Sequence, residues 1–273
     1  MIEQSNKAIS PNIVGIAQRI KDAGTTSRKL GAEKRAKALS WVYRWGWSSP
    51  TLLDDYVSPG RRGLVKGLVD QGYLESYPNP AGGGDKGNPR QAICLTEKGQ
   101  SFVEGYLDTR HDLLPQKRAD DIPWRQLRHD YLVQQASVGA IKGGRIKDAL
   151  SPKQVSQQSR AGIKQPDAIW ILDTDQRAAI ELELTRKKPG LEESQTVAAL
   201  VSSISTEPGD GKVDMVIIVS HSNAILDSYK ELLKPNRTLR LYTRDSQRKW
   251  VESGNMTIPA SISQKFIYHK IDL

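Results

Sequence analysis

The stretch 166–187, PDAIWILDTDQRAAIELELTRK, places acidic residues inside the most strand-like part of the chain. Two apolar runs, 168–172 and 178–184, flank the polar segment DTDQ at 173–176. A short polar segment between two runs of this kind is typical of a turn that joins paired strands. The pattern therefore predicts two neighbouring strands that fold back on each other.

The acids of the second run share one face of its predicted strand. Side chains alternate along a strand, so Glu181 and Glu183 project together, and Ile180 and Leu182 point to the other face, which we expect to be the core. Asp167 begins the first strand and therefore lies opposite the end of the second. We expect these three carboxylates to meet at one sheet edge, where they would repel each other unless a cation neutralised them.

Carboxylate oxygens are the ligands that Mg²⁺ and Mn²⁺ prefer, so the pattern predicts a Mg²⁺ or Mn²⁺ site formed by Asp167, Glu181 and Glu183. An ion held there would activate a water and stabilise charge on a phosphodiester. The alternative is that the two glutamates only keep an exposed sheet edge soluble. Asp173 and Asp175 are expected to be turn residues.

The rest of the second half alternates between helical and strand patterns. A helix is expected to open at Trp124, and the elements after the paired strands are helix 191–204, strand 213–220, helix 223–234 and strand 240–243. This alternation is typical of an α/β domain. His129, in the first of these helices and next to Asp130, is a candidate functional residue or a structural histidine.

The first half carries helix signals with a physical cause. A helical pattern begins at Glu33, and a second helix opens with Ser49 as N-cap and Pro50 at its first position. A third is expected to open with the same Ser-Pro pair at Ser58. Two short strand patterns, YLESY and QAICL, follow and enclose a Gly-rich loop at 79–90. The aromatic residues 41, 43, 45 and 47 are expected to pack in the core and at its rim.

Three helices, a two-stranded ribbon and a closing helix resemble a winged helix-turn-helix, on the phrases LVDQGYLES and LTEKGQSFV. In that family the third helix enters the major groove and the wing contacts the DNA backbone. The resemblance implies a set of groove-facing residues, Arg61, Arg62 and Lys66, and a set on the wing, Lys86 and Arg90. The alternative is a module for dimerisation or protein docking.

Composition favours a nucleic-acid partner. The 273 residues include 40 Lys and Arg against 31 Asp and Glu, which gives a formal charge of +9. No apolar run reaches the about 18 residues that span a bilayer, so we expect a cytoplasmic protein without a membrane partner. Cys94 is the single cysteine and cannot form an internal disulfide.

Together these patterns predict a mixed α/β chain, α+β overall. We expect a basic arm at 1–32, a winged-helix domain at 33–112, a linker at 113–123 and a second domain at 124–273. The order helix, strand, hairpin strand with Glu-x-Glu, helix, strand in the second domain resembles the PD-(D/E)XK nuclease fold. Pro166-Asp167 matches its PD, and 181–183 matches its (D/E)xK segment.

The resemblance implies that Asp167, Glu181 and Glu183 are catalytic, with His129 in support. The chain departs from the family pattern at one position, because Glu183 stands where the family has lysine. Lys187 is the first candidate for the missing positive group, since it shares the strand face if the strand continues that far. Residues 186 and 188 are its substitutes.

The phrases LRHDYLV, KQPDAIW and AIELELTRK, placed after a winged helix, resemble the replication-relaxation family and the MOBC-type plasmid relaxases. The resemblance implies recognition of an origin-of-transfer or replication-origin site in double-stranded DNA, and Mg²⁺- or Mn²⁺-dependent nicking of one strand in plasmid mobilisation or conjugation. Other mobilisation proteins would be partners.

Two other interpretations stay open. One is a DNA-binding regulator of plasmid replication or transfer whose nuclease-like core is inactive and serves for dimerisation. The other is a restriction-like endonuclease that makes double-strand breaks and therefore needs two active sites in a homodimer.

Overall fold

A computed structural model describes residues 27–84, 87–106, 122–156, 164–188, 190–204 and 212–271. Two compact units divide the chain: the first ends at Trp124 and the second begins at Arg125, apart from the segment Gly84–Asn88, which belongs to the second. Both units combine helices with strands, which is the mixed class that the sequence predicts. No helix in the described part of the chain has the length and apolar character needed to cross a membrane.

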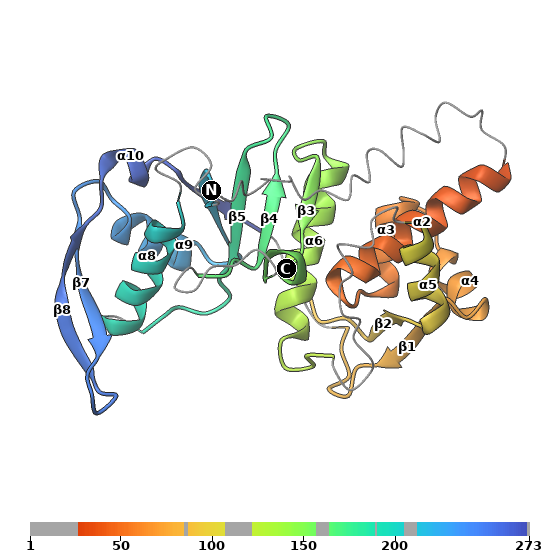
Figure 1. Cartoon of the computed structure of the whole chain (residues 1–273), viewed down its shortest axis with the longest axis horizontal. Helices are drawn as coiled ribbons and strands as arrows, with labels where there is room; N and C mark the ends of the chain where they lie inside the picture. Colours follow the sequence, from red (N-terminus) through yellow and green to blue (C-terminus); the bar gives the residue numbers. More distant parts are fainter. Residues whose placement is uncertain are drawn as a thin grey trace, which may run out of the picture. The chain divides into compact units, whose positions relative to one another are not determined.

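The first unit consists of helices around a two-stranded ribbon (Figure 1). Its elements are α2 (Ser27–Trp45), α3 (Pro50–Val57), α4 (Leu64–Asp70), β1 (Leu74–Pro78), β2 (Gln91–Leu95) and α5 (Glu97–Tyr106). The side chains of Trp41, Tyr43, Trp45 and Trp47 are each at most 6% exposed, so the predicted packing role of these aromatic residues is confirmed. The helix predicted from Glu33 begins earlier, at Ser27.

The start of α4 differs from the prediction. The sequence placed a helix start at Ser58, but Ser58 is the C-cap of α3, and α4 begins at Leu64. Two glycines at 60 and 63 adopt left-handed φ angles of 75° and 103°, which turn the chain between the helices. The buried Asp54 carboxylate then accepts the N–H groups of Gly63 and Val65, each at 2.9 Å, and caps α4.

Gly99 permits α5 to pack closely against the backbone of Tyr73, which immediately precedes β1. A Cβ placed on Gly99 would lie 2.1 Å from the carbonyl oxygen of Tyr73, which belongs to the backbone and cannot swing away. We therefore expect Gly99→Ala to lower the free energy of unfolding by about 1–3 kcal/mol in a urea denaturation of the chain.

Gly105 of the same helix is the matched control, because no atom of the described part of the chain lies within 4 Å of a Cβ built there. Gly105→Ala should raise stability by about 0.5–1 kcal/mol through helix propensity alone. Equal effects of the two substitutions would contradict the close approach at Gly99.

The second unit is built on a five-stranded sheet in the order β3-β4-β5-β6-β9. Its strands are β3 (Asp148–Leu150), β4 (Ala168–Ile171), β5 (Arg177–Leu182), β6 (Met215–Ser220) and β9 (Phe266–Lys270). The pairs β3–β4 and β4–β5 are antiparallel, whereas β5–β6 and β6–β9 are parallel. The predicted turn is confirmed, with Asp175 at a φ of 64°.

Helices cover this sheet, and the second unit also contains a separate two-stranded ribbon (Figure 1). They are α6 (Leu127–Lys142), α7 (Pro152–Ser156), α8 (Leu191–Ser203), α9 (Asn223–Leu232) and α10 (Ala260–Ser263), and the ribbon is β7 (Thr238–Arg244) with β8 (Trp250–Thr257). The indole N–H of Trp170 donates to Ser137 Oγ of α6 at 2.9 Å. Ala179 of β5 points to the opposite face of the sheet from Trp170 and packs in a core cluster with residues of α8 and α9.

This arrangement corrects the predicted position of the acids. β5 is the middle strand of the sheet, and both of its faces are covered, so Glu181 shares the Ala179 face with a core cluster. The strand ends at Leu182, which leaves Glu183 just beyond it. The carboxylates therefore lie at the carboxyl end of a central strand and not at an exposed edge.

Candidate functional site

The two glutamates are buried charges. Glu181 is 4% exposed and Glu183 is 6% exposed. Burying a carboxylate is costly unless it is paired or hydrogen-bonded, so a solubilising role does not explain these residues. The alternative of an exposed acidic strand face is therefore wrong.

Asp167 meets the end of β5 as the sequence predicts. Its backbone N–H donates to Ile180 O at 3.0 Å, and its Oδ2 accepts the N–H of Leu182 at 2.8 Å. The antiparallel pairing of β4 with β5 creates this contact, because Ala168 lies opposite Ile180. The carboxylate is thus fixed beside the strand that carries Glu181.

His129 joins this end of the cluster from the first turn of α6. Its Nε2 lies 3.3 Å from Asp167 Oδ2 and 3.2 Å from Leu182 O, and its Nδ1 lies 3.4 Å from Asp130 Oδ1. Burial alone would lower the pKa of His129, but hydrogen bonds and charge from Asp130 and Asp167 outweigh burial and raise it to about 10. The imidazole is therefore a cation between two carboxylates.

Lys164 is a cluster residue that the sequence patterns did not indicate. Its ammonium forms an ion pair with Glu181 Oε2, and it also interacts electrostatically with the carboxylates of Asp167 and Glu183. Burial lowers the pKa of Lys164, and the two carboxylates offset this only in part. The sequence feature that could have indicated Lys164 is its proximity to Asp167, which it precedes by three residues in the phrase KQPD.

Glu183 is held by two donors. Tyr229 of α9 donates its hydroxyl to Glu183 Oε1 at 2.8 Å, and Lys187 Nζ lies 3.2 Å from Oε2. Burial, followed by the charge and hydrogen bond of Glu183, raises the pKa of Tyr229, so the phenol stays protonated. Lys187, the predicted positive group, does reach the cluster, whereas Tyr229 had no signal in the sequence.

These residues form one mixed-charge cluster, defined here as Asp130, Asp167, Glu181, Glu183, His129, Lys164, Lys187 and Tyr229. Its ammonium groups can neutralise a phosphate, and its carboxylates can take a proton from water. Each central carboxylate already has a cation or donor of the chain beside it. Within the described ranges, no three His, Cys, Asp or Glu side chains are placed to hold a metal ion.

The predicted groove residues and Arg90 of the predicted wing lie in the first unit. Arg61, Arg62 and Lys66 are exposed, the two arginines just before α4 and the lysine on it. Arg90 is exposed at the end of the wing loop, next to β2, and Lys86 lies outside the described residues. Exposure leaves the basic side chains at 61, 62, 66 and 90 accessible to a phosphate backbone.

Comparisons of the chain with protein-family models, curated proteins and solved structures find no match.

The state of His129 gives a pH prediction. A histidine whose pKa is raised on folding stabilises the fold fully below its unfolded value of about 6.5, and this contribution is lost as pH rises toward about 10. We expect the imidazole proton resonances of His129, in protein freed of metal by EDTA, to titrate well above neutral pH. His129→Gln assigns the resonance, and Asp167→Asn should lower the midpoint. A midpoint near 6.5 in the parent would contradict the pairing.

Proposed function

We propose that this chain is a DNA-nicking protein, in which the first unit binds double-stranded DNA as a winged helix and the second unit cleaves one strand with a PD-(D/E)XK-type site. The observation that carries the proposal is the meeting of Asp167, Glu181 and Glu183 with Lys164 and Lys187 at the end of β5. Buried and half-buried acids and amines gathered in this way are typical of a reactive site.

The topology of the second unit supports the fold assignment. The elements α6, β4, β5, α8 and β6 follow in the order that carries the nuclease resemblance, with β3 and α7 as additional elements between α6 and β4, and with Asp167 and Glu181 on the two hairpin strands or at their ends. Lys164 and Lys187 both lie at the acids and supply the positive charge that the departure at Glu183 removes. The proposal therefore does not depend on a lysine at position 183.

Mg²⁺ or Mn²⁺ does not fit the described side chains as they stand, because Lys164 is paired with Glu181 and His129 with Asp167. No step of the proposed reaction is assigned to a metal ion. The chain's own groups supply these roles: Lys164 and Lys187 bind the phosphate, and a cluster carboxylate accepts the proton of the attacking water as its oxygen bonds to phosphorus. The P–O bond to the sugar oxygen breaks, and that oxygen takes a proton from a protonated nitrogen group of the cluster.

A second candidate is the DNA-binding regulator with an inactive core. The pairing of each central carboxylate within the chain favours it, since a buried network satisfied in this way also serves structure alone. The winged-helix unit would then carry the whole function.

The deciding experiment incubates the purified chain with supercoiled plasmid that carries its own origin, with Mg²⁺, with Mn²⁺ or with EDTA. Open-circular product supports the nickase, and linear product at early times supports the double-strand endonuclease. Intact plasmid under all conditions, with binding retained in a gel-shift assay, overturns the nickase in favour of the regulator.

A further inference from the structure

The ribbon of β7 and β8 is basic and carries exposed apolar side chains. Residues 237–257 contain five Arg or Lys and two Asp or Glu. Trp250 is 43% exposed and Val251 is 40% exposed, and both belong to the small set of large apolar side chains that the described residues leave exposed. A ribbon whose exposed apolar side chains on β8 lie beside basic side chains on β7 and in the connecting turn points to a binding surface.

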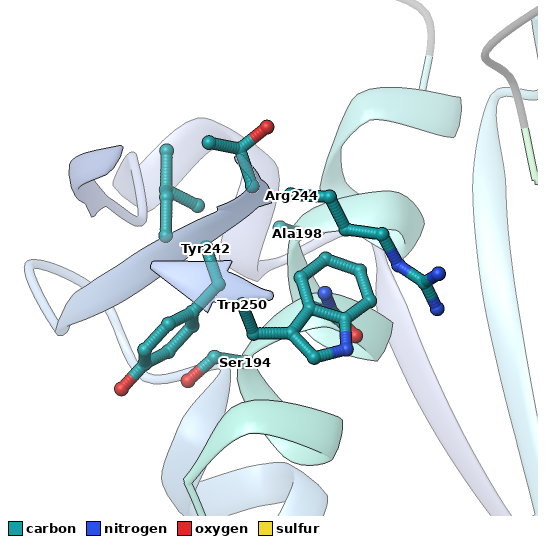
Figure 2. Close-up of a pocket in the computed structure, with 8 residues that line it drawn as sticks. Ser194, Ala198, Tyr242, Arg244 and Trp250 are labelled. Carbon is teal, nitrogen blue, oxygen red and sulfur yellow. The ribbon is translucent and has the colours of Figure 1, made fainter. Parts of the chain in front are cut away.

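A hollow lies where this ribbon meets α8. It has a volume of about 450 Å³ and is lined by residues of α8, β7 and β8, among them Ser194, Tyr242, Arg244 and Trp250. Figure 2 shows the indole of Trp250 and the phenol of Tyr242 on either side of Ser194, with the Arg244 side chain next to the indole. The hollow therefore has aromatic walls and a guanidinium at its rim.

Arg244 supports the indole. Its guanidinium carbon lies 4.8 Å from the centroid of the Trp250 ring, within the range of a cation–π contact. The two residues face each other across the ribbon, because Arg244 pairs with Trp250 in the strand register. The indole is thus held in place while 43% of the residue stays accessible.

The turn next to Trp250 is ordered and positively charged. Asp245 Oδ1 accepts the N–H groups of Gln247 at 2.8 Å and Lys249 at 2.9 Å, so this acid is used inside the turn. Arg248 and Lys249 are exposed immediately before the tryptophan. Further along β7, the side chain of Arg240 is 70% exposed. A row of exposed cations beside an aromatic surface matches the charge of a sugar-phosphate chain.

We propose that the hollow between α8 and the β7–β8 ribbon binds single-stranded DNA, with a base stacked on Trp250 and the phosphates beside Arg244, Arg248 and Lys249. An indole face recognises a base only when that base is unpaired, because the bases of a duplex are hidden in the stack. The choice of DNA over RNA rests on the proposed nicking function, in which the cleaved strand is released from its duplex.

The test is fluorescence anisotropy with a fluorescein-labelled thymidine oligomer of about 12 nucleotides, a length within the range that such surfaces bind. The background is the full chain with Arg61→Glu and Arg62→Glu, which removes the expected duplex contacts of the first unit. Trp250→Ala should weaken binding at least about ten-fold, and Trp250→Phe should restore most of it. Arg244→Ala should weaken it as well.

Ile267→Ala is the matched control, since Ile267 is 46% exposed on β9 and takes no part in the hollow. Unchanged affinity in Trp250→Ala, or binding of a uridine oligomer or a duplex of equal length as tightly as the thymidine oligomer, would overturn the proposal. A chain that binds the oligomer through Trp250 yet never nicks plasmid would refute the nicking function and leave this binding site standing.

Discussion

Glu181→Gln is expected to reduce plasmid nicking by about 10²–10⁴-fold while the protein still binds DNA. Glutamine keeps the volume of the buried side chain but removes the charge that pairs with Lys164. The reduction follows because the amine of Lys164 then loses the anion with which it is directly paired, and one proton acceptor of the cluster is gone. The measurement is the initial rate of open-circle formation under the conditions in which the parent is active.

Stability has to be followed in the same variant. Removing one partner of a buried ion pair costs about 3–5 kcal/mol, and the cost here should lie at or below the lower end because the Lys164 side chain is 28% exposed. Thermal unfolding therefore separates a folded, inactive variant from an unfolded one. Glu181→Ala, which also leaves a cavity, should be less stable than Glu181→Gln.

Asp175→Asn is the matched control for this experiment. It removes the same charge from the same hairpin, but the Asp175 side chain is 80% exposed and the residue sits at a φ of 64°, which asparagine tolerates. Nicking by this variant should equal that of the parent. If Glu181→Gln also nicks like the parent, the mixed-charge cluster is not the reactive site.

The double variant Arg61→Glu with Arg62→Glu is expected to lower the affinity for duplex DNA by about 100-fold or more at low salt. Both side chains are exposed just before α4, and each reversal replaces attraction to a phosphate with repulsion. The slope of log affinity against log salt should become shallower by about 0.9 for each phosphate that the variant no longer neutralises. A salt series of anisotropy titrations with an origin duplex measures both quantities.

Lys142→Glu with Arg145→Glu makes the same change in net charge at exposed positions of the second unit. This control should alter the duplex affinity far less, because it weakens only long-range attraction. If both double variants weaken binding equally, the effect comes from net charge, and the groove assignment of Arg61 and Arg62 fails.

The paired strands β4 and β5 could be predicted because their signals are local. Their apolar runs and the polar turn stand within one short stretch, and the turn residue Asp175 has the left-handed conformation that Asp accepts. The position of Asp167 beside Leu182 follows from that hairpin alone. The contact of Asp167 with β5, the strand that leads to Glu181 and Glu183, could therefore be predicted from the sequence.

What the sequence could not reveal depends on distant contacts or on weak patterns. Tyr229 and Glu183 are 46 positions apart in the chain, and the residues next to Tyr229 in the sequence form no pattern that predicts their contact. β3 has only three residues, and β8 is mostly exposed and polar, so neither shows an apolar alternation. The late start of α4 was missed because its cap, Asp54, belongs to the preceding helix.

The way in which Glu183 is held limits how this site can change during evolution. Its backbone N–H donates to Val219 O at 2.8 Å, and its carbonyl accepts the hydroxyl of Ser220 at 2.7 Å, so the main chain stays in place whatever the side chain is. The carboxylate, however, lies 3.2 Å from the ammonium of Lys187. A lysine introduced at position 183 alone would set two like charges against each other, so a lineage that acquires it should lose the cation at position 187. In related chains, the charges at these two positions are therefore expected to covary.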